Sequence, residues 1–146
     1  MPIRCEIISQ DRIVFQGDVD IVILPGSAGE LGILPHHAPL LTTLDYGIIK
    51  MRQGEREQVF AVAGGLAEVL PNIVTVLADA AESAEEIDIV RAEAAKKRAE
   101  TALEVAALPQ SDKLFAEAAL KRSKLRLDVV RRYRKAPPLT ERDISM

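Results

Sequence analysis

The sequence predicts an N-terminal all-β sandwich of about ten short antiparallel strands in two sheets, followed by a C-terminal antiparallel hairpin of two helices. Two observations support this fold class. Short segments rich in Val and Ile, separated by turn residues, fill positions 1–81. From position 82 the composition changes to Ala, Glu, Lys and Arg, which favour helices. The predicted domains are therefore 1–81 and 82–135, with a tail over 136–146.

Seven segments of the first domain are typical of strands: 3–8, 12–16, 19–24, 48–52, 58–63, 66–70 and 73–78. Pairs of turn-forming residues separate them, among them Gly17-Asp18, Pro25-Gly26, Gly64-Gly65 and Pro71-Asn72. Short strands at close spacing, joined by Gly and Pro turns, favour a sandwich or barrel. No long helical pattern interrupts them, which argues against a fold of alternating strands and helices.

The helical domain begins and ends at recognisable signals. Ser83 and Glu86 fit a capping box at the start of a first helix that extends to about residue 107. Pro109 interrupts the pattern, and Ser111 or Asp112 is suited to cap a second helix, over about 113–135. A short loop between two helices predicts that they pack antiparallel.

The predicted seam between the two helices is weak. Its inner positions are Ala94, Ala95, Ala99 and Ala102 on the first helix, and Phe115, Ala118, Arg122, Leu125 and Val129 on the second. Alanine buries little area, and a charge lies within the second stripe, so packing stabilises the hairpin only slightly. We therefore expect it to open and to use the same face against another protein.

Composition narrows the function classes. Residues 1–81 carry a net charge of −5 and residues 82–146 a net charge of +2, which indicates two units with different partners. Aromatic residues make up only 3%, which argues against a single-stranded nucleic-acid binder. Cys5 is the only cysteine and is expected to be a buried structural thiol. No apolar run is long enough to span a bilayer, and the N-terminus lacks the apolar core of a signal peptide.

The stretch GELGILPHHAPLLT, at positions 29–42, resembles the hallmark of epsilon subunits of F-type ATP synthases. The segments GGLAEV (64–69) and VTVLAD (74–79) support the resemblance, which covers nearly the whole chain. It implies a non-catalytic subunit. The residues themselves agree: a phosphate loop at 26–29 lacks its Gly-Lys-Ser/Thr ending, and no catalytic constellation occurs. His36 and His37 have no third metal ligand at suitable spacing, so turn residues at a subunit contact are the better interpretation.

The segment IDIVRA (87–92) matches a pattern that is associated with ATP binding in bacterial epsilon subunits. The resemblance implies a site made of Glu82, Asp88, Arg91, Ala92, Arg122 and Arg126, with ATP as a regulatory ligand and no required cofactor. Arg122 and Arg126 lie four residues apart and so share a helix face, and guanidinium groups bind phosphate in bidentate fashion. The alternative is an Asp88–Arg91 ion pair on a helix surface, with Arg122 on a solvated basic face.

The resemblance also implies partners and a mechanism. The sandwich would dock on the gamma subunit, rest on the c-subunit ring and rotate with them, at the cytoplasmic face of the bacterial inner membrane as a peripheral component. The helices would fold down to permit turnover, or extend into the alpha/beta catalytic ring to block ATP hydrolysis. Between 121 and 135 there are eight basic residues and only one acidic residue, Asp128, which suits an acidic loop of beta.

A second function class is a stand-alone binding module that offers its basic helix to an acidic partner or to nucleic acid. The acidic first domain, the scarcity of aromatic residues and the lack of a recognised DNA-binding motif argue against nucleic acid. Co-purification with gamma, rather than with oligonucleotides, would distinguish the two classes.

Overall fold

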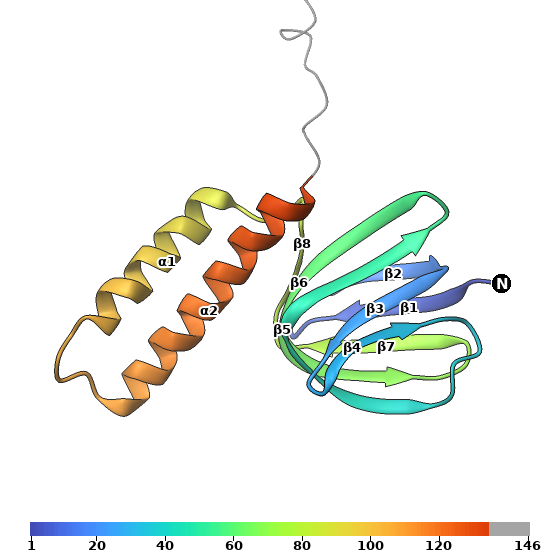
Figure 1. The fold of residues 1–146 in the computed structure, drawn as a ribbon, viewed down its shortest axis with the longest axis horizontal. Coiled ribbons are helices and arrows are strands. Elements are labelled where there is room, and N and C mark those ends of the chain that lie inside the picture. The colour runs from blue at the N-terminus through green and yellow to red at the C-terminus, as the bar shows by residue number, and fades with distance from the viewer. Residues whose placement is uncertain (135–146) are drawn as a thin grey trace, which may run out of the picture.

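The computed structural model describes residues 1–134, so the predicted tail over 136–146 and the last residue of the predicted hairpin lie outside it. The elements in chain order are β1 (Ile3–Ile8), β2 (Ile13–Val19), β3 (Ile21–Gly26), β4 (Gly29–Ile33), β5 (Leu40–Gln53), β6 (Arg56–Val69), β7 (Ile73–Ala78), β8 (Ala81–Ser83), α1 (Ile89–Leu103) and α2 (Gln110–Tyr133). Figure 1 shows a sheet that folds over into facing layers in sandwich fashion, with both helices beside it. The predicted fold class is confirmed.

The strands join in the order β2-β1-β7-β6-β5-β3-β4, and β8 pairs with β6. Within residues 1–134 there are thus eight strands in one continuous sheet, where about ten in two sheets were expected. One ladder also departs from the antiparallel expectation, because β1 and β7 pair in parallel from Arg4↔Ile73 to Ile8↔Leu77. Five strands lie between β1 and β7 in the chain, so no hairpin turn joins these two strands and their pairing need not be antiparallel.

The count falls because β5 and β6 are long, with 14 residues each, and pair along their whole length. The expected turn at Gly64-Gly65 is wrong, since both glycines lie inside β6. Their φ angles of 86° and 143° bend the strand without ending it. A Cβ on Gly65 would lie only 2.3 Å from the Leu77 carbonyl oxygen, so the bend also brings β6 very close to β7. The sequence pattern also did not predict β4, the first part of β5 or β8.

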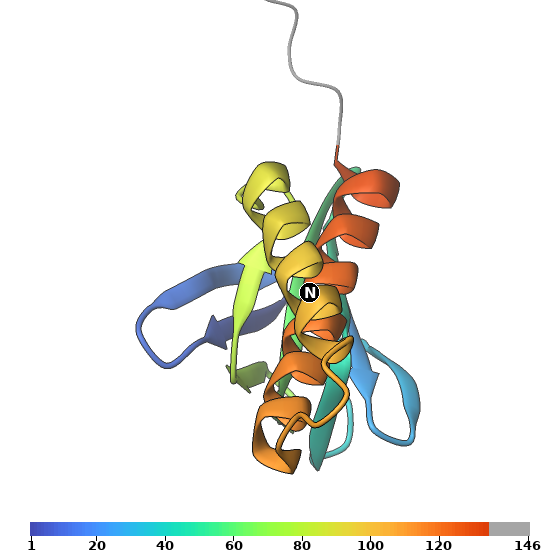
Figure 2. The same ribbon diagram turned by 90° about the vertical axis from the view of Figure 1, so that its left-hand side faces the viewer.

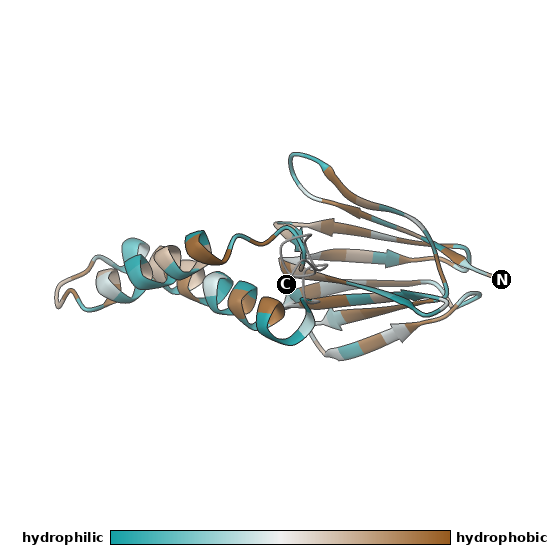
Figure 3. Cartoon of the chain, turned by 90° about the horizontal axis from the view of Figure 1, so that it is seen from above, coloured by the Kyte–Doolittle hydropathy of each residue, from teal (hydrophilic) through white to brown (hydrophobic). Residues whose placement is uncertain are grey.

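The sandwich core consists of alternate residues from facing strands, such as Ile3, Cys5 and Ile7 of β1 and Val74 and Val76 of β7. Figure 3 shows hydrophobic residues concentrated in the strands, whereas much of the hairpin is hydrophilic or neutral. Burial raises the pKa of the Cys5 thiol to about 12, which fits the predicted structural role.

The hairpin docks on β6 through α2, which lies between α1 and the sandwich (Figures 1 and 2). Residues 59–63 of β6 are buried on both faces of the strand. Phe60 and Val62 point into the sandwich core, while Val59 and Ala61 pack in a second cluster with Val129 of α2. This arrangement explains why the apolar run at 59–63 is continuous and not alternating.

The first helix begins later than the capping-box pattern predicted. Ser83 belongs to β8, where it pairs with Phe60, so the predicted capping box does not form. Asp88 is the N-cap instead, and its carboxylate accepts a hydrogen bond from the Arg91 backbone N–H at 3.1 Å. The second helix begins at Gln110 with Pro109 in the N-cap position, so neither Ser111 nor Asp112 caps it.

The helix seam differs in register from the predicted stripes. The buried residues of the two helices are Ala92, Ala99, Ala116, Ser123 and Val129. Phe115, expected in the seam, is 76% exposed, and Ala94 is exposed as well. Ala99 and Val129 of the predicted stripes are buried, and the buried side chains are mostly small, which allows close helix contact.

Candidate functional site

The six residues of the predicted site come from three elements that meet where the chain leaves the sandwich. Glu82 lies on β8, Asp88 caps α1, and Arg91 and Ala92 lie in the first turn of that helix. Arg122 and Arg126 lie on α2. The residues between β8 and α1, 84–88, form the only covalent path from the sandwich into the hairpin, and we call them the connector.

An ion pair joins the two sides of this site. The Arg126 guanidinium donates to the Glu82 carboxylate, and the two side chains are only 31% and 26% exposed. Partial burial lowers the pKa of Arg126 below its ordinary value, although a guanidinium remains charged at neutral pH. The pair therefore fixes α2 to the last strand of the sandwich.

A cavity of about 590 Å³ opens between the sandwich and the hairpin. Four of the six predicted residues line it: Glu82, Asp88, Arg91 and Arg126. Arg122 lines a smaller adjoining hollow together with Glu82 and Arg126. Ala92 is fully buried and does not line the cavity. The structure thus brings five of the predicted side chains to one place, with Ala92 behind them.

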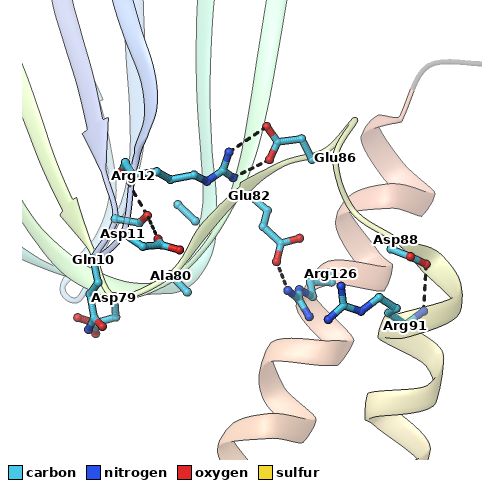
Figure 4. A pocket seen from close by; sticks show the side chains of 12 residues that line it. Gln10, Asp11, Arg12, Asp79, Ala80, Glu82, Glu86, Asp88, Arg91 and Arg126 are labelled. Carbon is cyan, nitrogen blue, oxygen red and sulfur yellow. Dashed lines mark hydrogen bonds and ion pairs between the residues drawn. The ribbon is translucent and has the colours of Figure 1, made fainter.

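Two guanidinium groups lie near each other in this cavity. Figure 4 shows Arg91 of α1 extending toward Arg126 of α2, whose own guanidinium is directed at Glu82. Arg91 has no carboxylate partner among the ion pairs of residues 1–134, so its charge is available to an anionic ligand. The alternative of a simple Asp88–Arg91 ion pair is not supported, because no such pair occurs among the ion pairs of residues 1–134.

The sandwich contributes further residues that no sequence motif predicted. Ser9 to Arg12 of the β1–β2 turn, and Asp79, Ala80 and Ala81, line the same cavity. Arg12 pairs with Glu86 of the connector at 2.7 Å, and this hydrogen-bonded contact holds the pKa of Glu86 below its ordinary value. The partners lie 74 positions apart, so no local pattern could have revealed the pair.

The basic residues of α2 largely face acidic or carbonyl groups of this chain. Lys121 lies 3.7 Å from Asp45 and 4.6 Å above the Tyr46 ring. Arg131 and Arg132 both pair with Asp128 of their own helix, at 2.8 Å and 3.2 Å. Lys121 and Arg126 thus pair with acidic residues of the sandwich, whereas Arg131 and Arg132 pair within their own helix, which leaves fewer of these charges available for nucleic acid.

The remaining candidate residues form no site. The His36 backbone N–H donates to the Pro71 carbonyl at 2.8 Å, and His37 Nδ1 lies 2.7 Å from the Ala38 carbonyl, so both belong to a turn. No group of three or more His, Cys, Asp or Glu residues suited to a metal ion occurs in residues 1–134. Neither of the helices described is long and apolar enough to cross a membrane.

Two family models match the chain in order. The first, the beta-sandwich domain of the ATP synthase delta/epsilon chain, matches residues 2–84. The second, the long alpha-helix domain of the same chain, matches residues 85–131. Their boundary falls after β8, within the connector.

Relatives and solved structures agree with these models. The ATP synthase epsilon chain of Dehalococcoides mccartyi is 47% identical over 92% of this chain and 96% of the relative. That of Syntrophobacter fumaroxidans is 46% identical over 87% and 94%. A chain in a structure of the Euglena gracilis mitochondrial ATP synthase has the same fold, with a TM-score of 0.75 at 22% identity and coverage of 88% and 81%. A chain in a structure of the Tetrahymena thermophila mitochondrial ATP synthase central stalk and c-ring has a TM-score of 0.58 at 15% identity, with coverage of 89% and 97%.

The order of sandwich and hairpin, the motif at 29–42 and near-complete coverage at close to half identity lead to one assignment: the chain belongs to the ATP synthase delta/epsilon chain family, as an epsilon chain, a non-catalytic subunit of that enzyme.

Proposed function

We propose that this epsilon chain rotates with the central stalk and acts as a reversible brake on ATP hydrolysis. The sandwich docks on the gamma subunit and rests on the c-subunit ring, as a peripheral component at the cytoplasmic face of the membrane. The hairpin restrains hydrolysis when it extends toward the alpha/beta ring and its acidic beta loop. The central-stalk complex that contains a chain of the same fold supports the first part. The structure of the hairpin supports the second.

The hairpin has the features of a detachable element. Its contact with the sandwich is a small apolar cluster around Val129 and Ile87, supplemented by polar contacts such as Arg126–Glu82 and Lys121–Asp45. Polar contacts exchange readily with water or with another protein's charges, whereas a large apolar interface would not. The hairpin described here is in the folded position, against β6.

ATP is the ligand that we propose for the cavity, and the neighbouring guanidinium groups of Arg91 and Arg126 are the observation that carries this proposal. A triphosphate lying between them would connect α1 to α2. Arg122, one turn before Arg126, extends the same basic face. Asp88 keeps Arg91 in place by capping the helix. The cavity also holds five carboxylates, and Arg91 lies away from two of them, Asp11 and Asp79, so we place the phosphates beside Arg91.

Binding between the two helices gives ATP a regulatory effect. The extended hairpin separates the groups that form the cavity, so ATP binds only the folded state. A ligand that binds one of two states shifts the population toward that state. Abundant ATP would therefore keep the hairpin folded and the brake released.

Calorimetric titration of the full chain with ATP tests this proposal. We expect saturable binding that weakens about tenfold or more in Arg91→Ala and in Arg126→Ala, because each loses a charge-assisted phosphate contact. Arg131→Ala is the matched control, since its guanidinium pairs only with Asp128 on the outer face of the same helix. The absence of binding at millimolar ATP, or equal loss in the control, would refute ATP as the ligand.

A further inference from the structure

We propose that Arg12 of the sandwich is a positioning residue of the nucleotide site, acting through Glu86. This inference rests on the proposed function, because it concerns the same cavity. It adds a residue from the β1–β2 turn to a site otherwise made by β8 and the helices. It also means that the sandwich takes part in setting the affinity of the hairpin for ATP.

Arg12 lies at the end of a turn whose shape is fixed by hydrogen bonds. The turn between β1 and β2 is closed by the Ser9 backbone N–H, which donates to the Arg12 carbonyl at 2.9 Å. The Ser9 hydroxyl donates to the Asp11 carboxylate, also at 2.9 Å. These contacts hold the turn in one shape, so the Arg12 side chain projects from a fixed point of the sandwich.

The second step concerns the contact itself. Arg12 extends toward the connector and donates to both oxygens of Glu86, Nη2 to Oε2 at 2.7 Å and Nη1 to Oε1 at 3.4 Å (Figure 4). A guanidinium–carboxylate pair of this kind restricts orientation as well as distance. Both side chains are close to half exposed, at 44% and 45%, so the pair matters for geometry more than for global stability.

The third step links the pair to the ligand groups. Glu86 lies two residues before Asp88, which caps α1 and so fixes the first turn that carries Arg91. Arg12, Glu86, Asp88, Arg91 and Arg126 line the same cavity. The Arg12–Glu86 ion pair therefore sets the position of the start of α1, and with it of Arg91, relative to Arg126.

The fourth step concerns charge. An unpaired Glu86 carboxylate on the wall of this cavity would repel a triphosphate, and the Arg12 guanidinium neutralises it. Loss of Arg12 thus has two effects of the same sign: it frees the connector, and it exposes a negative charge beside the ligand. Loss of Glu86 also frees the connector, but it removes a negative charge beside the ligand, so Arg12→Ala should weaken ATP binding more than Glu86→Gln does.

The test is ATP titration of the full chain with four variants: Arg12→Ala, Glu86→Gln, the double variant of these two, and the charge exchange Arg12→Glu with Glu86→Arg. We expect Kd to rise about tenfold in Arg12→Ala and roughly threefold in Glu86→Gln, with the double variant no weaker than Arg12→Ala. The charge exchange should recover most of the affinity. Arg52→Ala is the control, because its guanidinium pairs with Glu57 on the sandwich, outside the cavity lining.

A second measurement does not depend on the ligand. Hydrogen exchange of the backbone amides at 86–92 in the ATP-free protein should accelerate in Arg12→Ala and return toward wild type in the charge exchange. If Arg12→Ala weakens ATP binding but leaves the exchange at 86–92 unchanged, Arg12 contacts phosphate directly and positioning through Glu86 is refuted. Unchanged Kd in Arg12→Ala, with normal wild-type binding, refutes the inference alone. Failure of the wild type to bind refutes the proposed function and with it a nucleotide role for Arg12.

Discussion

The Arg134 guanidinium donates two hydrogen bonds to the carbonyl oxygen of Ala84, from Nε at 3.0 Å and from Nη2 at 2.8 Å. Nη2 also donates to the Ile87 carbonyl. The residue that follows α2 is therefore attached to both ends of the path by which the chain enters α1. Since Arg12 holds Glu86 from the other side, the connector is fastened by the sandwich and by the end of the hairpin at once.

Replacing Arg134 by Ala should make the hairpin open more often. The variant loses hydrogen bonds from a charged donor to half-buried carbonyls, and such bonds are worth about 1.5–3 kcal/mol, or roughly a tenfold or greater rise in the open population. Spin labels on the sandwich and on the hairpin tip would report the distance distribution. Arg131→Ala, which removes only a contact within α2, is the control. An identical distribution in wild type and Arg134→Ala would contradict this role.

The Arg12–Glu86 contact should be visible in the titration of Glu86. Its pKa lies below the ordinary glutamate value because Arg12 donates to the carboxylate. A carboxylate with a depressed folded-state pKa stabilises the fold above its unfolded pKa, and this contribution is lost as the pH falls through the folded value. Carboxyl NMR should therefore show Glu86 titrating at unusually acidic pH, and at higher pH in Arg12→Ala. The same midpoint in both proteins would argue against the contact.

Gly65→Ala should destabilise the sandwich strongly. The added Cβ would meet the Leu77 carbonyl oxygen at 2.3 Å, at a φ of +143° that other residues rarely adopt. We expect a loss of roughly 2–4 kcal/mol in the free energy of unfolding, from combined overlap and backbone strain. Gly32→Ala is the matched control, because no atom lies within 4 Å of its added Cβ. Denaturant unfolding measures both; equal losses would contradict the close approach.

Features set by neighbouring residues in the sequence were predicted correctly, whereas features that depend on strand pairing were not. The first and seventh strands, 3–8 and 73–78, match their predicted bounds, because each carries its own alternating pattern. The Gly64-Gly65 pair was interpreted as a turn, since a bend inside a strand and a turn between strands use the same residue type. Asp88 and Ser83 both fit an N-cap, and only the pairing of β8 with β6 decides between them.

Some residues of the candidate site could be predicted from the sequence, and others could be found only from the tertiary structure. The motif at 87–92 drew attention to Asp88 and Arg91, and Arg122 and Arg126 followed from the family resemblance. Arg12 and Glu86 meet only because the β1–β2 turn folds beside the connector, and this contact depends on the tertiary structure. Phe115 failed as a seam residue for a similar reason: α2 must contact both α1 and β6, so a single helical period does not define its inner face.

The sandwich should fold without the helices if the cut respects β8. A fragment of residues 1–84 keeps the ladder from Ala81 to Ser83 and the Ala84 N–H bond to the Val59 carbonyl at 2.9 Å. A fragment of residues 1–80 loses both and exposes Val59 and Ala61 further. We expect both to unfold cooperatively, with the shorter one less stable by about 1–2 kcal/mol. Thermal unfolding compares them. A non-cooperative transition for residues 1–84 would contradict an independent sandwich domain.

Removing the hairpin should release ATP hydrolysis without preventing assembly. Truncation after Ala84 leaves every strand in place, and with them the surfaces that we propose for the gamma subunit and the c-ring. It removes the basic second helix and Phe115, which is 76% exposed and is available to a partner once the hairpin extends. We expect the reconstituted enzyme with truncated epsilon to hydrolyse ATP several-fold faster at low ATP, where the unliganded hairpin would otherwise extend.

A full-length variant separates the effect of the basic side chains from the effect of removing the whole hairpin. Arg122, Arg126, Arg131 and Arg132 replaced together by Ala should release hydrolysis in the same direction but less completely, because exposed charges are screened by salt and the apolar contacts remain. The Arg126→Ala variant alone tests the opposite effect, since it frees α2 from Glu82 and should favour extension and stronger inhibition. ATPase rates across low and high ATP measure all three. If the truncated enzyme is no faster than the intact one at any ATP concentration, the hairpin is not a brake and the chain serves only to couple rotation.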